Sequence, residues 1–519
     1  MASRRDELNA YTFAKKRTVA AFLQPSPSGT EEGAPKPLKA VVPSLIVAAL
    51  VVAGFGAWGM FSPIAPKGWD TPGTRVIIGK QSTTRYVVLE TGQGKDKKTL
   101  LHPVLNLASA RLLLNPDQFQ VVQVDDKTLD EGKPPRGPVL GIPYAPDRLP
   151  DPKDAGTKKR WAVCEQPGGG KGASVQKAAF LFAERDAKRT DSAEKLKGGE
   201  VLYVKGQKGN AQFLVDRTGT KYPVKADDPR LLNALVGLSK EGLPREPQPV
   251  TDDWLATLKT GDEIDFPEIE GRVGTPTEIP GSNLSGTENR IGTVLVTETA
   301  SGPQHYVVLP GRIQPVTPFT AQLIIGSPAA ADLDMDGHPV SADAGSFVPD
   351  ATPFHGDADW PTLKSTAINA ATGAGARDTL CSVLADVDEK GGTMLTTWAG
   401  TDYPADIMAG GTSTYVTPGT GLLYTQIQGR QKPSGGSLFL VTDTGLRYAV
   451  QSNGDSGAAR SKIGAGEQKQ PDGKPEPSEA QKRLGYESVT PVLVPIEWSE
   501  FLSKGPRLDT NSARQPQGS

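Results

Sequence analysis

The longest apolar stretch of the chain lies near its N-terminus. Residues 40–66 carry no charged side chain, and residues 41–61 show no polar helical face. About 20 such residues suffice for a helix to cross a bilayer, whereas buried helices of this length in soluble proteins usually keep a polar face. Residues 40–62 are therefore predicted to form a single transmembrane helix. A cleaved signal peptide is the alternative.

A second helical pattern precedes this stretch. Apolar residues recur at helical spacing from Leu8 to Leu23, where a basic cluster interrupts them. Pro25 ends the pattern, and residues 24–39 are rich in Pro, Ser, Gly and Glu, which is typical of a flexible tether. The helix is expected to dock on a partner or on an anionic membrane surface. The expected docking residues are Tyr11, Phe13, Lys15, Lys16, Arg17 and Phe22.

The orientation of the predicted membrane helix can be inferred only from the charges of the whole N-terminal tail. Basic residues flank both ends of the apolar stretch, so the local charges do not decide it. The tail adds further Lys and Arg residues on the N-terminal side. We therefore expect residues 1–39 to lie in the cytoplasm and residues 63–519 to form an extracytoplasmic domain, as in a single-pass inner membrane protein.

Residues 63–519 contain an internal repeat. Residues 214–224 and 440–450 both follow the pattern L-V-x-x-T-G-x-[KR]-Y-x-V without a gap, and each is followed later by W-x3-L-x2-G-x2-[IL]-D. Apolar runs joined by a Gly or Thr turn predict β-hairpins. Core packing is the simplest role for the large aromatic residues of this pattern, which are Tyr222, Tyr448, Trp254 and Trp498.

Two weaker copies share only a basic-Tyr-x-Val core. They contain Tyr86 and Tyr306, and each is followed by a Pro-Val pair and an Ala-[Arg/Gln]-Leu run. One hairpin with one short helix cannot bury its apolar face alone, so four units should pack on each other or on a shared centre. The predicted repeats cover residues 74–150, 198–270, 290–330 and 435–509, all approximate limits.

The two cysteines occupy nearly equivalent positions in two halves of the chain. Cys164 follows Tyr86 by 78 residues, and Cys381 follows Tyr306 by 75 residues. In a duplicated fold, equivalent positions meet at the pseudo-twofold axis, which favours a Cys164–Cys381 disulfide in an oxidising compartment. Two free buried thiols are the alternative.

The amino-acid composition limits the possible fold classes and the possible kinds of binding partner. The net charge of −2 excludes a global nucleic-acid binder, which needs a surplus of Lys and Arg. The chain has 58 Gly and 45 Pro but only 6% aromatic residues, which favours short strands joined by many turns over a helical bundle. A mainly β or α+β fold is therefore predicted.

Motifs for catalysis are missing from the sequence. Every Gly-Lys pair lacks a following Ser or Thr, so no P-loop is present, and Gly168-Gly169-Gly170-Lys171 is the nearest approach to one. None of the four histidines belongs to an H-E-x-x-H motif, and the sequence contains no G-x-S-x-G motif. We predict no catalytic residue and no cofactor, and a catalytic triad scattered along the sequence is the alternative.

One acidic cluster has the spacing of a calcium loop. Asp332, Asp334 and Asp336 precede Gly337, and Asp343 stands at the twelfth position. Pro339 inside the loop and the absence of a final Glu count against calcium. A solvated acidic turn is the alternative.

Several segments together resemble the EccB family of actinobacterial type VII secretion systems. The resemblance covers nearly the whole chain, including the apolar stretch, and rests on residues 9–17, 103–112, 136–138, 141–143 and 161–164. It implies an elongated extracytoplasmic domain with pseudo-twofold halves, in which four β-rich repeats surround a disulfide-containing central part, approximately residues 158–197 and 376–430. Residues 454–477 and similar Gly-, Pro- and Lys-rich insertions are expected to be loops.

The same resemblance implies a function in assembly. EccB proteins build the inner membrane pore with the EccC motor ATPase, EccD and usually EccE, beside the mycosin protease, and a homo-oligomer within the complex is expected. Family members are often labelled ATPases, so an ATP-hydrolysing secretion component is one alternative. A cell-wall binding module is another, since exposed repeats are also typical of such modules.

Overall fold

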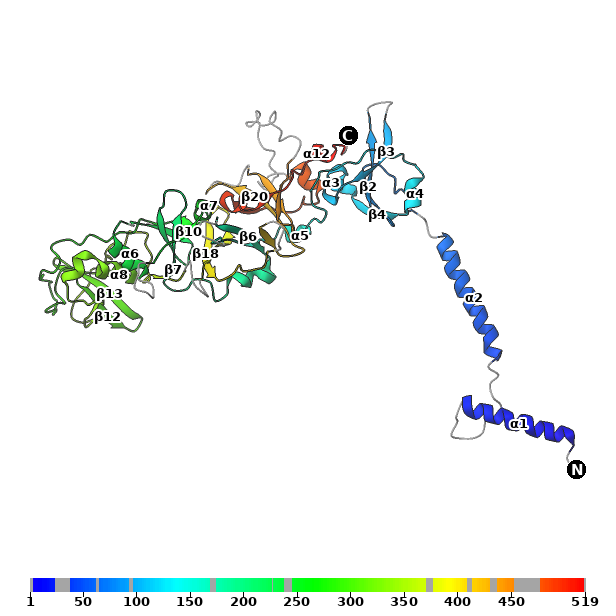
Figure 1. Cartoon of the computed structure of the whole chain (residues 1–519), viewed down its shortest axis with the longest axis horizontal. Helices are drawn as coiled ribbons and strands as arrows, with labels where there is room; N and C mark the ends of the chain where they lie inside the picture. The colour runs from blue at the N-terminus through cyan, green and yellow to red at the C-terminus, as the bar shows by residue number, and fades with distance from the viewer. Residues whose placement is uncertain are drawn as a thin grey trace. The chain divides into compact units, whose positions relative to one another are not determined.

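A computed structural model of the chain describes residues 3–23, 38–61, 65–92, 97–168, 174–225, 227–237, 245–369, 377–407, 413–429, 436–451 and 477–517 (Figure 1). The chain divides into two compact units. Unit 1 comprises Met1–Trp69, Gly79–Ser82 and Val122–Lys133, and unit 2 comprises Asp70–Ile78, Thr83–Val121 and Pro134–Ser519.

Helices dominate unit 1. Its two long helices are α1 (Arg4–Leu23) and α2 (Leu38–Phe61), and a short helix α4 (Asp126–Asp130) follows β4 (Gln120–Val124). The helix α2 forms where the sequence predicts one. In the described part of the chain, no helix combines the length and the apolar character required to cross a membrane. The predicted span over residues 40–62 is therefore not confirmed and stays a prediction.

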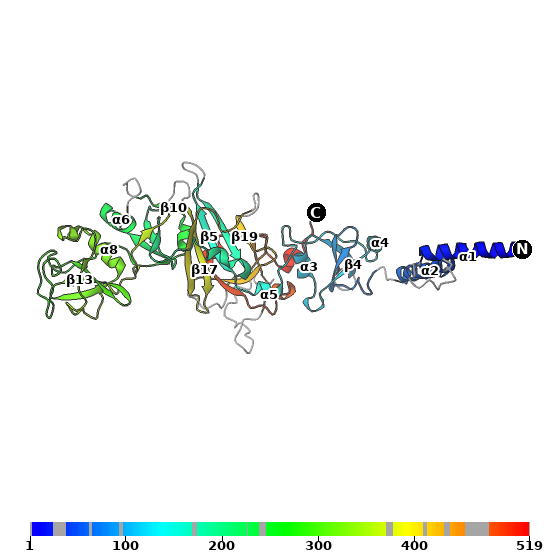
Figure 2. The same ribbon diagram turned by 90° about the horizontal axis from the view of Figure 1, so that it is seen from below.

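The central sheet of unit 2 consists of two hairpins that meet at β5 and β17, with the parallel strand β19 beside β6 (Figure 2). Its strand order is β18-β17-β5-β6-β19. The middle of β5 is buried without interruption, which is typical of a strand covered on both faces. The strands are β5 (Arg160–Gln166), β6 (Gln176–Phe182), β17 (Thr379–Val387), β18 (Thr393–Gly400) and β19 (Thr414–Val416).

Two further sheets are built alike, each from an antiparallel meander with a parallel strand on either side. The first has the order β10-β7-β8-β9-β11, and a sixth strand, β16 (Thr366–Ala367), also pairs with β7. Its strands are β7 (Glu200–Gly206), β8 (Gln212–Val215), β9 (Thr220–Val224), β10 (Gln248–Val250) and β11 (Lys259–Thr260). The second has the order β23-β20-β21-β22-β24. Its strands are β20 (Leu422–Ile427), β21 (Leu438–Val441), β22 (Leu446–Ala449), β23 (Val492–Pro495) and β24 (Ser503–Lys504).

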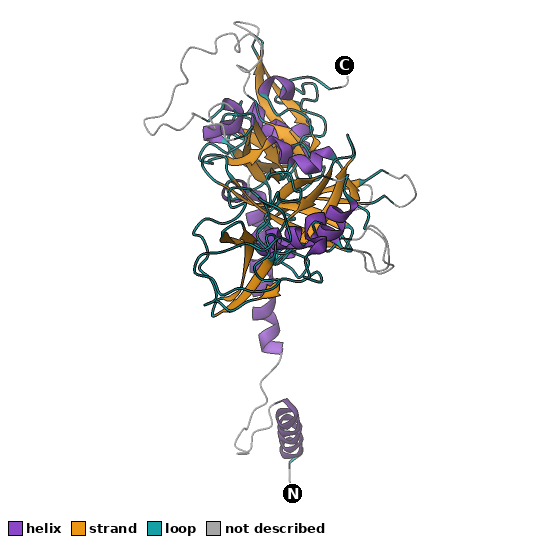
Figure 3. Cartoon of the chain, turned by 90° about the vertical axis from the view of Figure 1, so that its left-hand side faces the viewer, coloured by secondary structure: helices purple, strands orange, loops and turns teal. Residues whose placement is uncertain are grey.

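The two remaining sheets are also antiparallel meanders. One contains β1 (Arg75–Gly79), β2 (Arg85–Thr91) and β3 (Lys98–Val104), with β2 between the other two. The other has the order β14-β13-β12-β15 and consists of β12 (Val294–Thr299), β13 (Gly302–Leu309), β14 (Arg312–Val316) and β15 (Val340–Ser341). Strands thus predominate in unit 2 (Figure 3), which confirms the predicted sheet-rich α+β fold class.

A short helix follows the third strand of each meander. Asn106, Asp228 and Thr317 cap α3 (Leu107–Leu113), α6 (Pro229–Val236) and α8 (Pro318–Gly326), because each side chain accepts a hydrogen bond from a first-turn N–H. Ser478 caps α10 (Glu479–Arg483) in the same way. The other short helices are α5 (Pro152–Ala155), α7 (Asp252–Ala256), α11 (Ile496–Ser499), α12 (Thr510–Ala513), η2 (Pro116–Gln118), η3 (Glu184–Thr190) and η4 (Pro328–Asp332).

Apolar cores of unit 2 are shared between sheets. The largest cluster contains Trp161 of the central sheet together with Trp254, which lies between β10 and β11, and Trp498, which lies between β23 and β24. A second cluster joins the β1–β3 sheet and α3 to the sheet of β20–β24. Sheets that share a cluster stabilise one another, whereas the sheet of β12–β15 packs against α8 and η4 of its own segment. The repeat limits predicted from the sequence stay predictions.

Candidate functional site

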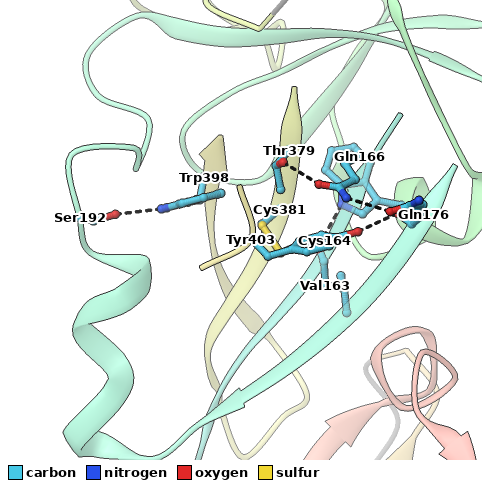
Figure 4. The surroundings of a disulfide bond; sticks show 10 residues. Val163, Cys164, Gln166, Gln176, Ser192, Thr379, Cys381, Trp398 and Tyr403 are labelled. Atoms are coloured by element: carbon cyan, nitrogen blue, oxygen red, sulfur yellow. Dashed lines mark hydrogen bonds between the residues drawn. A yellow bond between two sulfur atoms is a disulfide. The ribbon is translucent and has the colours of Figure 1, made fainter. Parts of the chain in front are cut away.

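A disulfide lies at the centre of the central sheet (Figure 4). Cys164 of β5 and Cys381 of β17 are direct partners in the antiparallel register, and both side chains are fully buried. The sequence prediction of this disulfide is confirmed, and the alternative of two free thiols is excluded. The bond joins two segments that are 217 residues apart, at the place where the two hairpins meet.

Side-chain hydrogen bonds extend the link beyond the sulfur atoms. The Thr379 hydroxyl donates to the Gln166 side-chain oxygen at 3.2 Å, and the Gln166 amide donates to Gln176 at 2.9 Å. The Tyr403 hydroxyl donates to the carbonyl of Gln176 at 3.2 Å (Figure 4). Residues from both halves of the chain therefore link β5, β6 and β17 at the same end of these strands.

Glu165, next to the disulfide, is a buried carboxylate that sequence reasoning missed. It is 1% exposed and accepts hydrogen bonds from the backbone N–H of Thr251, at 2.8 Å, and from the Thr251 hydroxyl. Burial raises the pKa of Glu165, although hydrogen bonds from Thr251 and the charge of Lys177 oppose the shift. Thr251 caps α7, so Glu165 ties the central sheet to the helix that carries Trp254. Glu165 directly follows the apolar run Trp161–Cys164, and nothing local in the sequence marks it as buried.

The two strong sequence repeats fold into the same local arrangement. Trp254 in α7 and Trp498 in α11 are fully buried. The chain then returns as a parallel edge strand, where a glycine lies under a tyrosine ring: Gly261 under Tyr222 and Gly505 under Tyr448. Each glycine N–H also donates to the carbonyl of the residue before that tyrosine. The motif residues therefore form the core of each repeat.

A basic side chain occupies the same position in both strong repeats. The Lys221 ammonium donates to the carbonyl of Leu255 at 2.7 Å, and the Arg447 guanidinium donates to the Ser499 hydroxyl at 2.5 Å. Each basic side chain thus contacts the last turn of the short helix that carries the tryptophan of its repeat. The helix dipole favours positive charge at this end. Burial lowers the pKa of Lys221, while the charge of Asp252 opposes this shift. The shared Lys or Arg position in the sequence motif was the signal for this role.

Tyr86 and Tyr306 differ from the other two tyrosines in position. Both stand on the second strand of a meander, whereas Tyr222 and Tyr448 stand on the third strand. The alignment of the four tyrosines as equivalents is wrong by one strand. His102 holds the third-strand position in the first meander, where its ring packs against Gly137. The misalignment arose because Arg-Tyr-Val-Val resembles Lys-Tyr-Pro-Val locally.

The acidic cluster at residues 332–343 forms a turn in which the carboxylates face solvent. Asp332, Asp334, Asp336 and Asp343 are all exposed, while Leu333 and Met335 between them are buried. No group of three His, Cys, Asp or Glu side chains within the described ranges is arranged to hold a metal ion. Calcium binding by this cluster stays a prediction, with the solvated turn as the alternative.

The predicted docking residues of the tail lie on α1 with their side chains exposed. Tyr11 is 68% exposed and Phe22 is 88% exposed, and Phe13 is also exposed. Lys15, Lys16 and Arg17 are exposed on the same helix. Exposed aromatic side chains beside basic residues can bind a protein groove or a lipid surface. Docking itself stays a prediction.

Catalytic chemistry has little support in the geometry. The P-loop-like residues Gly169, Gly170 and Lys171 lie outside the described residues. A cavity of about 530 Å³ is bordered by the β17–β18 turn, α7 and α11, with Asp386, Asp388 and Glu497 in its lining. Asp386 pairs with Lys158, and Asp388 accepts hydrogen bonds from two backbone N–H groups of its own turn. Asp386 and Asp388 therefore stabilise the local structure.

Comparison with protein families gives a match over the whole chain. Residues 1–518 match the family model described as "Type VII secretion system ESX-1, transport TM domain B", which is the EccB model. A curated relative is the ESX-3 secretion system ATPase EccB3 of Mycolicibacterium smegmatis, 27% identical over 446 residues, covering 81% of this chain and 77% of the relative. Another is the ESX-5 secretion system ATPase EccB5 of Mycobacterium marinum, 28% identical over 329 residues, covering 62% of this chain and 59% of the relative.

Solved structures share the fold. A chain of an intact ESX-5 inner membrane complex matches with a TM-score of 0.55 at 22% identity, covering 100% of this chain and 96% of that chain. The EccB3 dimer from the ESX-3 core complex matches with a TM-score of 0.53 at 23% identity, covering 85% of this chain and 99% of that chain.

Proposed function

Because this chain belongs to the EccB family of type VII secretion system proteins, we propose that it is a structural component of an inner membrane secretion complex. The observation that carries the proposal is the family match, which covers residues 1–518. The described contacts agree with this role, since Glu165 and the motif tryptophans join the central sheet to its neighbours.

Anchoring in the membrane is the second part of the proposal. We propose that residues 40–62 cross the inner membrane once, with residues 1–39 in the cytoplasm and residues 63–519 outside it. The charge-free sequence supports the span. The disulfide supports the extracytoplasmic side, because disulfides persist in oxidising compartments. A reporter that is active only outside the cytoplasm, fused after Ser519, should be active, and activity of a cytoplasmic reporter there would contradict this topology.

The proposed partners follow from the family. We propose EccC, EccD and EccE, with the mycosin protease beside them, and further copies of the chain itself. A related protein, EccB3 of the ESX-3 core complex, was solved as a dimer. The exposed aromatic and basic side chains of α1 support a contact with a cytoplasmic partner.

Loss of the chain tests the structural role. In cells that lack it, native electrophoresis of membrane extracts should show that EccC no longer migrates in a large complex, and re-expression of the chain should restore the complex. A large EccC complex of unchanged size in the absence of the chain would contradict the proposal. A defect in secretion with an intact complex would also contradict it, because a structural component must act through assembly.

ATP hydrolysis is the second candidate function, favoured by the names of the curated relatives. The sequence itself offers no P-loop to hold phosphates and Mg²⁺. Under the structural proposal, ATPase activity in a preparation of the chain should disappear when EccC is removed completely. Activity that remains in proportion to the amount of this chain would favour the enzyme.

A further inference from the structure

A second cavity of unit 2 lies beside the sheet of β12–β15. It has a volume of about 290 Å³, and its lining comes from α6, β13, α8, the turn at residues 337–339 and Lys364. The helices α6 and α8 approach closely here, because a Cβ on Gly326 would collide with Ala234. Small-molecule sites usually range from about 300 Å³ upward, so this volume suits a ligand of only a few heavy atoms.

The lining has a marked bias in charge. Its ionisable residues are His305, His338 and Lys364, and none of its lining residues is Asp or Glu. Gln322 also borders the cavity, but its amide donates to the carbonyls of Ala234 and Ser365. Lys364 is exposed and forms no ion pair with the described residues. Cationic and imidazole groups are therefore available to an anion.

His305 supplies a neutral hydrogen-bond donor. Its Nδ1 atom is buried and has no hydrogen-bond partner among the described residues. A proton on Nδ1 would find an acceptor in an anionic oxygen bound beside it, which would satisfy this buried atom. Burial lowers the pKa of His305, and the nearby charge of Glu298 opposes that shift. A neutral imidazole that lines the cavity can donate one hydrogen bond to an anionic oxygen.

The remaining walls are apolar. Pro318, Ala321, Ile325 and Pro339 contribute aliphatic surface to the same cavity. A bare inorganic anion would leave this surface in contact with water, whereas a short aliphatic group would cover it. We propose that this cavity is a binding site for a small carboxylate that carries a short aliphatic group, held by Lys364, His338 and His305. The site is independent of the assembly role proposed above.

Binding of simple probes to the detergent-solubilised full chain tests the proposal. Propionate and inorganic phosphate are titrated separately, and binding is followed by saturation-transfer difference NMR for propionate and by calorimetry for both. Propionate should bind more tightly than phosphate, because only propionate fills the apolar part of the cavity. Phosphate binding as tight as or tighter than propionate binding would overturn the proposal, and so would the absence of propionate binding at about 50 mM, which corresponds to less than about 2 kcal/mol of affinity.

Matched variants locate the site. Lys364→Gln and His338→Gln change exposed side chains, so the fold should be preserved, and each should weaken propionate binding by about fivefold, as expected for the loss of one polar or charged contact of roughly 1 kcal/mol. Lys208→Gln removes an exposed lysine at the turn between β7 and β8 and serves as the control. Equal binding by the control and both site variants would overturn the assignment, and so would equal weakening in all three.

Discussion

The aromatic ring of Tyr448 lies directly against the Cα of Gly505. A Cβ atom at Gly505 would lie 2.5 Å from a carbon of that ring, which is closer than side-chain contacts allow. The ring belongs to the third strand of a meander, and the glycine follows the parallel edge strand β24. The same relationship joins Tyr222 to Gly261 in the other strong repeat. The tyrosine ring therefore leaves no room for a side chain at the glycine of each motif.

Substitution at this glycine should destabilise the chain. Gly505→Ala should reduce the free energy of unfolding by about 1–3 kcal/mol, the usual cost of forcing an extra carbon into a packed core. Thermal unfolding of the purified chain measures the effect. Gly345→Ala is the matched control, because no atom lies within 4 Å of a Cβ at that position. Equal melting temperatures for the two variants would show that Tyr448 does not confine the site.

Removal of the disulfide should weaken unit 2. Replacing both Cys164 and Cys381 with Ser avoids a lone thiol and releases a loop of 217 residues. On the chain-entropy model, the loss is about 5 kcal/mol. Denaturant titration of wild type and variant, without reductant, measures it. An unchanged midpoint would contradict a structural role for the bond. Two thiols that react with an alkylating reagent in denatured, unreduced wild type would contradict the bond itself.

The buried carboxyl of Glu165 should make stability depend on pH. Because burial raises its pKa in the folded state, the folded chain binds this proton more tightly than the unfolded chain does. Its contribution to stability is therefore present below the ordinary carboxyl pKa and is lost as the pH rises through the raised pKa. Glu165→Gln removes this titration. The stability of wild type relative to Glu165→Gln, measured by denaturant titration from pH 4 to pH 8, should fall with rising pH, and a constant difference would contradict the account.

Exposed aromatic residues of α1 should act in assembly. The double substitution of Tyr11 and Phe22 with Ala should leave the melting temperature of the chain unchanged, because both side chains are exposed. Recovery of EccC and EccD with the chain should fall, since aromatic side chains commonly dominate interface energies. Val348→Ala, which changes an exposed apolar residue of unit 2, is the control. Wild-type recovery of both partners with the α1 variant would rule out α1 as the docking element.

Local patterns in the sequence predicted the strong repeats well. The L-V-x-x-T-G-x-[KR]-Y-x-V pattern contains the β8–β9 and β21–β22 hairpins, since apolar strands around a Gly turn specify a hairpin within a few residues. The disulfide was also predictable, because a single pair of cysteines at matching positions leaves one partner for each. The weak repeats were aligned wrongly by one strand, because a basic residue followed by Tyr fits either the second or the third strand of a meander.

Long-range partners could not be predicted in the same way. Glu165 meets Thr251, which is 86 residues away, and no local pattern shows that this carboxylate is buried. The parallel edge strands β10 and β23 are also invisible locally, because each has only three or four residues and depends on a partner strand distant in sequence. Such short strands exist only through tertiary contacts, so propensity does not reveal them.

The central claim is that this chain acts as a structural part of a membrane secretion complex. Native extraction of the tagged chain from secreting cells, followed by mass measurement and identification of the bound proteins, tests it most directly. We predict one large assembly that contains several copies of the chain together with EccC and EccD. Recovery of the chain alone, from cells in which EccC and EccD are still found together in a large complex, would contradict the claim.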